Sequence, residues 1–378
     1  MKYFTIIFLL LSPLSLCAND ASFHMSGNQL VPVMETDIAV TKEILTIKRT
    51  SSDRLTVTVY YEFFNPKNTK NLIVGFEASS PDRGKEGVSP AKDWHPYIKD
   101  FTVEMNNIHL PHQITLVHDS LYMDGSKISS LTTEEAIATE KEYTDSDDQT
   151  RFNYVYYFDA KFKAGKNILK HTYTFELTGG IHYYYAFHYI LTAAMRWGNK
   201  QIDDFTLILD MGDYQDFCVY NTPFGKDTYQ LIGSGKILEK APNPFSFGDD
   251  GETDRLRFYI QKGKIEYKIK NFRPKGELFL YSPRYYPYYA EFDCEKKQEL
   301  PFSSLADSSY GNPIEAADGI SKRILRNLPF ARRGYIFKTS EIQKFYSQQV
   351  WYIPDPDYKS SMESLTKEEQ EWVQYYSN

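Results

Sequence analysis

The chain has 378 residues, with 50 acidic against 43 basic side chains and a formal net charge of −7. This mild acidic excess favours solubility and argues against nucleic acid as a general partner. Tyrosine and phenylalanine are abundant, with 31 and 25 residues, so large rings are available for both faces of a sheet.

The N-terminus is typical of an export signal. A short basic start is followed by an apolar run from Phe4 to Leu11, which is too short to span a bilayer. We therefore predict a signal peptide over residues 1–18 and a periplasmic or secreted protein. The alternative is a lipobox-like cleavage that leaves Cys17 as the lipid anchor of an outer-membrane lipoprotein. No later run is long and apolar enough for a transmembrane helix.

Two cysteines, Cys218 and Cys294, remain after cleavage behind Ala18. In an oxidising compartment two cysteines can pair, but the sequence does not show whether these two lie close together. A disulfide and a pair of free thiols therefore both remain open.

Residues 38 to about 283 show strand after strand with period-two alternation. The clearest runs lie at 55–64, 72–76, 101–105, 152–158, 172–177 and 205–211. Many short strands with turn punctuation predict an antiparallel β-sandwich over residues 19–290, or two sandwiches in series. Residues 119–150 are either the boundary between two such units or a long insertion that contains a short helix opened by Thr132 or Thr133.

The strand-rich region also contains glycine-rich and acidic stretches. Apolar alternation on both sides of Gly263 predicts a hairpin over residues 256–269. Residues 233–236 read GSGK and imitate a phosphate loop, but they lack its other residues and predict a turn. The acidic stretches 145–148 and 249–254 have no calcium-loop spacing and predict solvated turns.

The pattern becomes helical near residue 312. Residues 291–312 lack periodicity and predict a linker, and residues 313–378 predict a small helical domain. Asn312 and Pro313 form a typical helix start, after which Ile320, Ile324 and Leu328 recur four residues apart. Further helices are predicted from Ser340 and from a capping box at Thr366.

The densest aromatic run, residues 183–189, is followed by a turn at Trp197-Gly198-Asn199 and then by a strand. The segment YILTAAMRWGNKQIDDFTL, at residues 189–207, and GNQLVP, at residues 27–32, resemble an exported bacterial family of unknown function. That resemblance implies no established activity.

The C-terminal region, from residue 313 onward, resembles the YARHG domain of bacterial extracytoplasmic proteins. The naming stretch reads FARRG at residues 330–334, and Trp351-Tyr352 precede a proline-containing turn. Arg333 replaces the family's histidine, so no role for a titrating imidazole is expected there. Pro329 lacks an N–H donor and predicts the end or a kink of the first helix, with Gly334 after it as a C′ residue. The resemblance implies an exported module of unknown function.

No catalytic constellation is recognisable. The sequence has neither G-x-S-x-G nor H-E-x-x-H, and His182 and His188 do not have zinc-ligand spacing. We therefore predict no cofactor, no metal and no enzymatic activity. The favoured function is a binding or scaffold protein of the bacterial cell envelope; the alternative is a secreted hydrolase of an envelope polymer with dispersed catalytic residues.

Two candidate contact surfaces follow from charge and aromatic content. Six cations and no acid lie between Lys322 and Lys338, so Arg326, Arg332 and Arg333 are predicted to meet an anionic partner, either an envelope polymer or an envelope protein. The alternative is that these cations are ordinary solvated charges on a helix surface and bind no partner. Tyr184, Tyr286 and Tyr288 are predicted as an aromatic contact surface, because alternate residues of a strand point outward. Packing within the sheet is the alternative.

Overall fold

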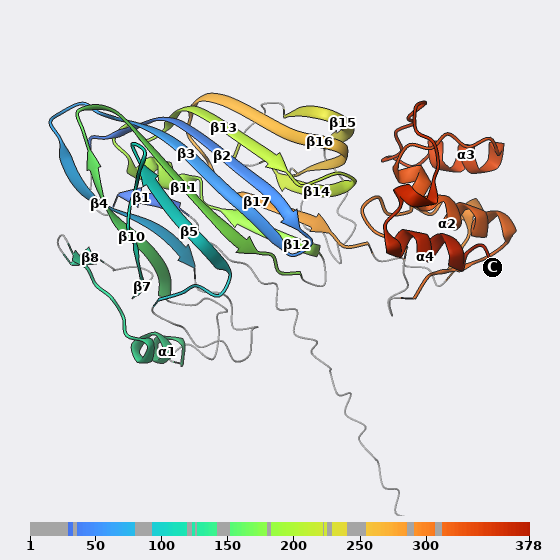
Figure 1. The fold of residues 1–378 in the computed structure, drawn as a ribbon, viewed down its shortest axis with the longest axis horizontal. Coiled ribbons are helices and arrows are strands. Elements are labelled where there is room, and N and C mark those ends of the chain that lie inside the picture. Colours follow the sequence, from blue (N-terminus) through green and yellow to red (C-terminus); the bar gives the residue numbers. More distant parts are fainter. Residues whose placement is uncertain are drawn as a thin grey trace, which may run out of the picture.

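The computed structural model describes residues 29–32, 36–79, 93–118, 123–124, 127–141, 152–179, 183–221, 223–224, 229–239, 255–285, 291–306 and 312–378. Tyr286, Tyr288, His182, the predicted signal peptide with Cys17, and the acidic stretches 145–148 and 249–254 lie outside these residues. The protein is mostly β with a C-terminal helical region, as predicted (Figure 1).

Eleven strands form the larger sheet. They are β2 (Ala39–Ser51), β3 (Arg54–Asn65), β5 (Ile98–Met105), β6 (Ile108–His109), β11 (Gly165–Glu176), β12 (Tyr183–Tyr189), β13 (Ile202–Asp210), β14 (Gln215–Tyr220), β15 (Gln230–Glu239), β16 (Arg255–Phe272) and β17 (Leu278–Pro283). β13 and β14 lie end to end along one edge of β16, and β15 pairs with its other edge. Gly212 and Tyr214, with φ of 91° and 55°, turn the chain between β13 and β14.

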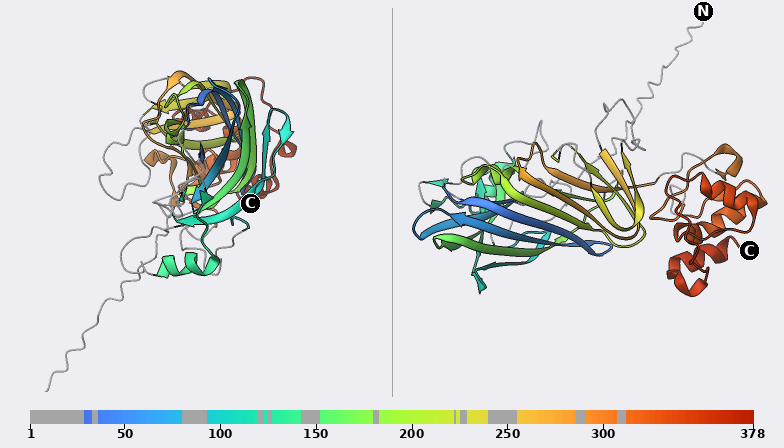
Figure 2. Two further views of the ribbon diagram at one scale, coloured as in Figure 1. Left: turned by 90° about the vertical axis from the view of Figure 1, so that its left-hand side faces the viewer. Right: turned by 90° about the horizontal axis from the view of Figure 1, so that it is seen from above.

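The sheet divides at this point into two branches. β2 follows β13 in a parallel pairing and leads to β3, β11, β5 and β6, whereas β17 and then β12 follow β14. The branches curl until their inner faces meet, because the Tyr189 hydroxyl of β12 lies 3.2 Å from the Tyr61 hydroxyl of β3. The Phe187 ring of β12 likewise lies 5.2 Å from the Phe175 ring of β11. The strands therefore enclose a shared interior (Figure 2).

The smaller sheet packs on the β5–β11 side of the larger one. Its strands are β1 (Gln29–Pro32), β4 (Lys70–Ser79), β10 (Phe152–Phe162) and β7 (Gln113–His118), paired in that order. Phe101 of β5 lies 5.1 Å from the ring of Phe76 and 4.8 Å from that of Tyr156. Buried residues of both sheets form one hydrophobic core, so the sandwich is single rather than two in series.

The segment between β7 and β10 is an insertion rather than a domain boundary, because β7 and β10 pair directly with each other. It contains β8 (Met123–Asp124), β9 (Lys127–Ile128) and α1 (Thr133–Lys141). Thr132 and Glu135 cap α1 with reciprocal hydrogen bonds of 2.8 and 3.1 Å, as the sequence predicts.

The predicted hairpin around Gly263 is wrong, because β16 runs through it without a break. Gly263 and Gly233 pair across β16 and β15 with φ of 108° and 131°. A side chain on Gly263 would place its Cβ 2.0 Å from the Ile232 carbonyl oxygen. This glycine pair changes which residues face the core, and the change in alternation resembles a turn in the sequence. Residues 233–236, predicted as a turn, lie within β15.

The C-terminal domain has its own core around three helices, α2 (Gly319–Arg332), α3 (Ser340–Ser347) and α4 (Lys367–Tyr375). The predicted linker is wrong for residues 291–306, since Phe292, Leu300 and Phe302 are buried in this core. β18 (Glu291–Phe292) also pairs in parallel with β19 (Glu315–Ala316). These apolar residues show no period because they fill gaps between helices rather than one face of an element. None of the described helices is long and apolar enough to cross a membrane.

Local signals predict some helix ends and miss others. The capping box of α4 is present, with bonds of 3.2 and 3.0 Å between Thr366 and Glu369. Gly334 follows α2 with φ of 85°, as predicted for a C′ residue. α2 itself begins later than predicted: Asp318, not Asn312, caps it through the Ser321 amide at 2.7 Å. Glu315 and Ala316, which precede α2, form β19 and pair with β18 instead.

Candidate functional site

Arg332 and Arg333 lie inside the C-terminal domain rather than on its surface. Arg333 donates two hydrogen bonds to the Glu369 carboxylate, of 2.9 and 2.8 Å, and Arg332 donates one of 3.2 Å. All three side chains are buried, and the Arg333 guanidinium also lies 4.8 Å from the Tyr214 ring of the β region. Glu369 therefore holds both arginines inside the domain, and neither faces an external anion in this arrangement.

Burial and ion pairing shift the pKa values of this cluster in opposite directions. Burial lowers the pKa of Arg332 to about 10, although the Glu369 charge opposes this shift. Burial also acts to raise the pKa of Glu369, but the hydrogen bond from Arg333 and the charge of Arg332 hold it below its usual value. Glu369 therefore stays ionised at neutral pH.

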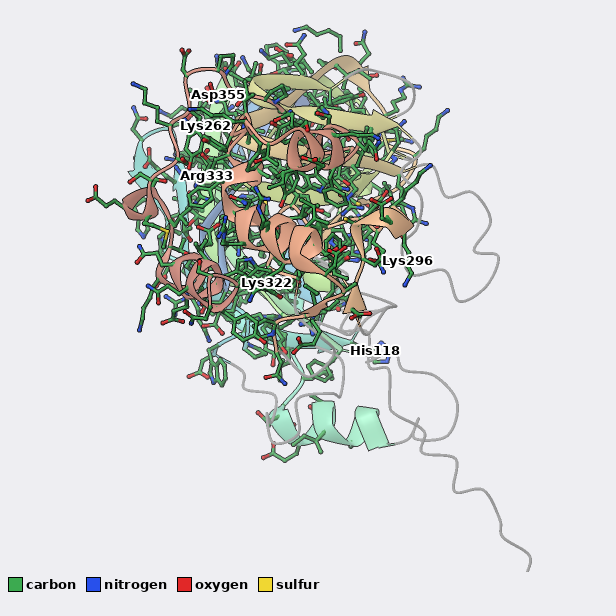
Figure 3. The ribbon with its side chains drawn as sticks, turned by 90° about the vertical axis from the view of Figure 1, so that its right-hand side faces the viewer. His118, Lys262, Lys296, Lys322, Arg333 and Asp355 are labelled. Atoms are coloured by element: carbon green, nitrogen blue, oxygen red, sulfur yellow. The ribbon has the colours of Figure 1, made fainter. Side chains whose placement is uncertain are left out.

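The remaining four cations of this segment form a basic face on the domain, which we define as Lys322, Arg323, Arg326 and Lys338. Arg323 and Lys338 are exposed, and Arg326 is half-buried, as is Lys322, which is labelled in Figure 3. Arg323 donates a hydrogen bond of 3.1 Å to the Thr339 hydroxyl. Within the residues that the structure describes, none of the four forms an ion pair with a carboxylate. Of the three arginines that sequence analysis selects, only Arg326 belongs to this face.

Tyr184 reaches the surface of β12, where it is 37% exposed. The pairing of β12 with β17 shifts between Tyr183 and Tyr185, and Tyr184 sits at this irregularity. The Arg284 guanidinium lies 5.3 Å from its ring. Tyr185 faces the main core, whereas Tyr183 packs on the opposite face of the sheet.

A row of rings crosses that opposite, outer face, and we define this aromatic row as His188, Phe279, Tyr220 and Arg255. They come from β12, β17, β14 and β16 respectively. The His188 and Phe279 rings lie 4.1 Å apart, the Phe279 and Tyr220 rings 5.3 Å, and the Arg255 guanidinium 5.9 Å from the Tyr220 ring. The three rings are half-buried, so part of each reaches the surface.

A buried layer supports the aromatic row. Tyr183, Ala186, Cys218 and Tyr281 form a small hydrophobic cluster against which Tyr220 and Phe279 pack. Arg255 is held in place by a 3.0 Å hydrogen bond to the Tyr281 hydroxyl. Sequence analysis misses this row because its members come from four strands that are far apart in the chain. The one available signal is the alternation of Phe279 and Tyr281 with the core residues Leu278 and Leu280.

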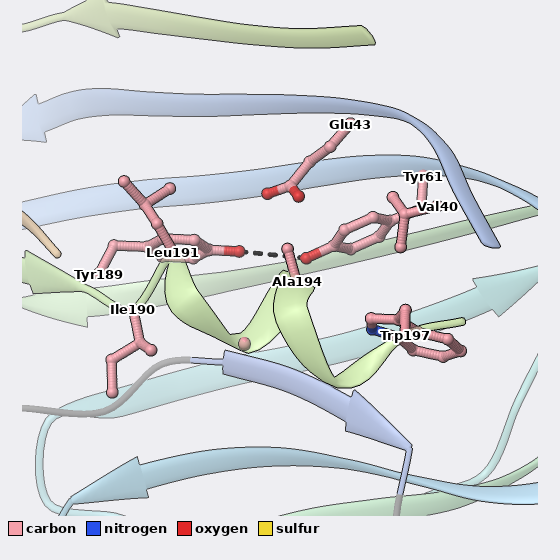
Figure 4. A pocket seen from close by; sticks show the side chains of 9 residues that line it. Val40, Glu43, Tyr61, Tyr189, Ile190, Leu191, Ala194 and Trp197 are labelled. Atoms are coloured by element: carbon pink, nitrogen blue, oxygen red, sulfur yellow. Dashed lines mark hydrogen bonds between the residues drawn. The ribbon is translucent and has the colours of Figure 1, made fainter. Parts of the chain in front are cut away.

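A second, internal feature is a small cavity beneath the 3₁₀ helix η1 (Thr192–Arg196), shown in Figure 4. Its volume is about 10 Å³, which is room for roughly one water molecule. It is lined by Val40, Glu43, Tyr61, Tyr189, Ile190, Leu191, Ala193, Ala194 and Trp197. Glu43 is only 4% exposed, and burial raises its pKa to about 8, against the effect of a hydrogen bond from Tyr189.

The remaining sequence predictions concern metal ligands, the two cysteines and His188. Within the described residues no three His, Cys, Asp or Glu side chains gather to hold a metal ion. Cys218 and Cys294 are both free thiols, the first buried and the second half-buried. His188, whose spacing from His182 does not suit zinc, lies at the end of the aromatic row.

Comparison with known families identifies the C-terminal domain. The model of the YARHG domain matches residues 313–378, the part that contains α2, α3, α4 and the basic face. These residues are a YARHG domain, which confirms the resemblance carried by FARRG. A search of curated proteins finds no match to the chain.

Three solved structures resemble the chain weakly. One is a "putative nutrient binding protein" from Legionella pneumophila, with 14% identity over 93% of this chain and 97% of that chain and a TM-score of 0.48. Baculovirus P35 shares 12% identity over 68% of this chain and 100% of its own, with a TM-score of 0.24. A two-domain M1 zinc metallopeptidase bound to L-arginine shares 8% identity over 65% and 42%, also with a TM-score of 0.24. At such scores none of them bears on function.

Proposed function

We propose that this is an exported, non-enzymatic binding protein of the bacterial cell envelope, which holds a glycan-containing envelope polymer against the aromatic row. The observation that carries the proposal is the row itself: three half-buried rings and a guanidinium aligned across four adjacent strands. Large exposed or half-exposed apolar surfaces on a folded protein usually mark a contact site.

The chemistry of the row suits a sugar chain. The C–H face of a pyranose ring is apolar and packs on an aromatic face, whereas its hydroxyls need hydrogen-bond partners at the edge. The half-buried His188 imidazole stands at one end of the row, and Arg255, which is only 6% exposed, packs against Tyr220 at the other end. Because the sheet holds these side chains in place, little conformational entropy is lost when a ligand is bound.

The basic face of the YARHG domain adds an electrostatic contribution. This face carries positive charge on an otherwise acidic protein, through Lys322, Arg323, Arg326 and Lys338. We propose that it binds the anionic groups of the same polymer. Arg332 and Arg333 instead stabilise the domain that carries this face.

Sedimentation with purified envelope polymer tests the proposal. The double variant Tyr220→Ala/Phe279→Ala should bind at least about tenfold more weakly, since loss of a central aromatic contact typically costs more than ~1 kcal/mol. Phe64→Ala is the matched control, because Phe64 is 47% exposed and lies on β3, outside the row. Equal binding by both variants and the wild type would show that the aromatic row does not bind the polymer. Release of soluble fragments during incubation would indicate a hydrolase instead.

A further inference from the structure

Glu43 occupies a position that the pattern of β2 assigns to an apolar residue. It alternates with Leu45 and Ile47, which are fully buried in the main core, and it is itself 4% exposed. A carboxylate at such depth is normally paired with a cation, because its desolvation otherwise costs several kcal/mol. No cation among the described residues acts on Glu43; burial and the Tyr189 hydroxyl are the influences on its ionisation.

The groups that face Glu43 are phenolic. Tyr61 comes from β3 and Tyr189 from β12, and their hydroxyls share a hydrogen bond of 3.2 Å; Tyr173 of β11 acts on these two phenols rather than on Glu43 itself. Phe205, paired with Glu43 across β13, is apolar. Burial raises the pKa of all three tyrosines well above the usual value, so they are uncharged hydroxyls at any physiological pH. Glu43 is therefore the group of this cluster that can change charge.

Residues 190–197, which we define as the lid, cover the cavity into which Glu43 points (Figure 4). Hydrogen bonds to single side chains hold one end: the Leu191 and Thr192 amides donate to Glu277 across 2.6 and 3.1 Å. Arg196, with half of its side chain exposed, turns away from the cavity to Glu77 at 3.3 Å. Within the described residues the lid takes part in no sheet pairing, but Leu191, Ala194 and Trp197 pack into the main core, with the Trp197 ring 4.4 Å from the Phe63 ring.

The other end of the lid is fastened to the start of β2. Asn199 exchanges two hydrogen bonds with the Val40 backbone, of 3.1 and 3.0 Å. The Gly198 amide donates to the Ile38 carbonyl at 2.8 Å, and a Cβ at Gly198 would lie 2.6 Å from the Asp37 backbone. This close approach requires glycine, and it anchors this end of the lid to the strand.

We propose that Glu43 is the proton switch of this lid, which is closed while Glu43 carries a proton and opens the cavity to water when Glu43 ionises. An anionic Glu43 has no cation to pair with, so water must solvate it. The closed cavity admits about one water molecule, which is too few to hydrate a carboxylate. Movement of the lid supplies the missing water.

Burial raises the pKa of Glu43 in the closed state to about 8, whereas a hydrated Glu43 in the open state should titrate near the ordinary value of 4.5. Between these two values the population of the open state should rise about tenfold per pH unit, because opening is then coupled to the loss of one proton. Above about pH 8 the population levels off, because Glu43 is then ionised in both states.

Hydrogen exchange of the full chain, corrected for the intrinsic pH dependence of exchange, tests the switch on peptides that cover residues 190–197. Wild-type protection should fall about tenfold per pH unit between about pH 6 and 8 and level off above that, whereas Glu43→Gln should show no such fall. Tyr189→Phe removes the hydroxyl that stabilises the carboxylate, so protection should level off at a higher pH. Glu277→Gln is the structural control, and it should lower protection by a similar factor at every pH.

An infrared band of a protonated carboxylic acid, followed against pH in the wild type, provides a readout that needs no variant. It should disappear near the pH at which lid protection stops falling. Identical exchange profiles for the wild type and Glu43→Gln, or a band lost well below neutral pH, would overturn the switch.

Discussion

The indole N–H of Trp372 donates a 2.6 Å hydrogen bond to the backbone carbonyl of Leu325. This carbonyl lies four residues before Pro329, inside α2, and proline has no N–H to offer it. Of the two outcomes predicted for Pro329, an end or a kink of the first helix, the end is wrong: α4 supplies the donor that the helix lacks, and α2 continues to Arg332.

Replacement of Trp372 by Phe should therefore destabilise the YARHG domain by about 1–3 kcal/mol beyond the loss of packing, because it leaves a buried carbonyl without a partner. Urea unfolding followed by circular dichroism measures the effect. In a Pro329→Ala background the helix regains its own donor, so the same Trp372→Phe change should cost less. Additive effects of the two substitutions would show that the indole bond does not compensate for the proline.

The buried pair of Arg333 and Glu369 is a second support of this domain. Glu369→Gln keeps a side chain that can complete the capping box with Thr366 but leaves two buried guanidinium groups without a counter-charge. We expect a loss of about 3–5 kcal/mol in the free energy of unfolding. Glu371→Gln is the control, because its ion pair with Lys367 spans 3.8 Å with both side chains largely exposed, and little change is expected. Equal effects of the two substitutions would contradict a structural role for the buried pair.

Glu43 makes the stability of the β region depend on pH. Between the ordinary pKa of 4.5 and about 8, the unfolded chain loses the proton of Glu43 while the folded chain keeps it. The folded state then binds more protons, so the contribution of Glu43 to stability falls as pH rises through this window and levels off above it. The total loss is roughly 3 to 5 kcal/mol.

Glu43→Gln removes this titration. The variant and the wild type should have similar unfolding free energies near pH 4.5, and the variant should be increasingly the more stable one towards pH 8. Urea midpoints at pH 4.5, 6 and 8 provide the comparison. A constant difference across these values would mean that Glu43 is not buried as a neutral acid.

The two thiols should differ sharply in reactivity. Cys218 is 2% exposed and burial raises its pKa to about 11, whereas Cys294 is half-buried at the start of η2 (Cys294–Lys296). Since the thiolate is the reactive species, a chain that lacks residues 1–18 should titrate one thiol when folded and two in urea. Cys294→Ser should abolish the fast reaction. No reactive thiol under either condition would instead indicate a disulfide.

Sequence reasoning succeeds where one element determines its own pattern. The alternation at 55–64 predicts β3, because each residue faces either core or outer surface. The reciprocal bonds of Thr366 and Glu369 likewise depend only on neighbours in one turn. Such features need no knowledge of the rest of the chain.

It fails where distant segments decide the outcome. The positive run around Arg332 and Arg333 predicts a surface, but Glu369, on a later helix, draws both side chains inward. The helix start at Pro313 is overridden by the pairing of Glu315 with β18. The aromatic row depends on the register of four strands, and no single stretch of sequence contains it.

The most direct test of the binding function is a hydrogen-exchange footprint of the full chain with a soluble oligosaccharide prepared from the envelope polymer. We predict new protection in β12, β17 and β14, the strands that carry His188, Phe279 and Tyr220, with a smaller and salt-sensitive effect on α2. Protection confined to α2, or none at ligand concentrations that saturate binding, would contradict the assignment of the aromatic row as the binding site.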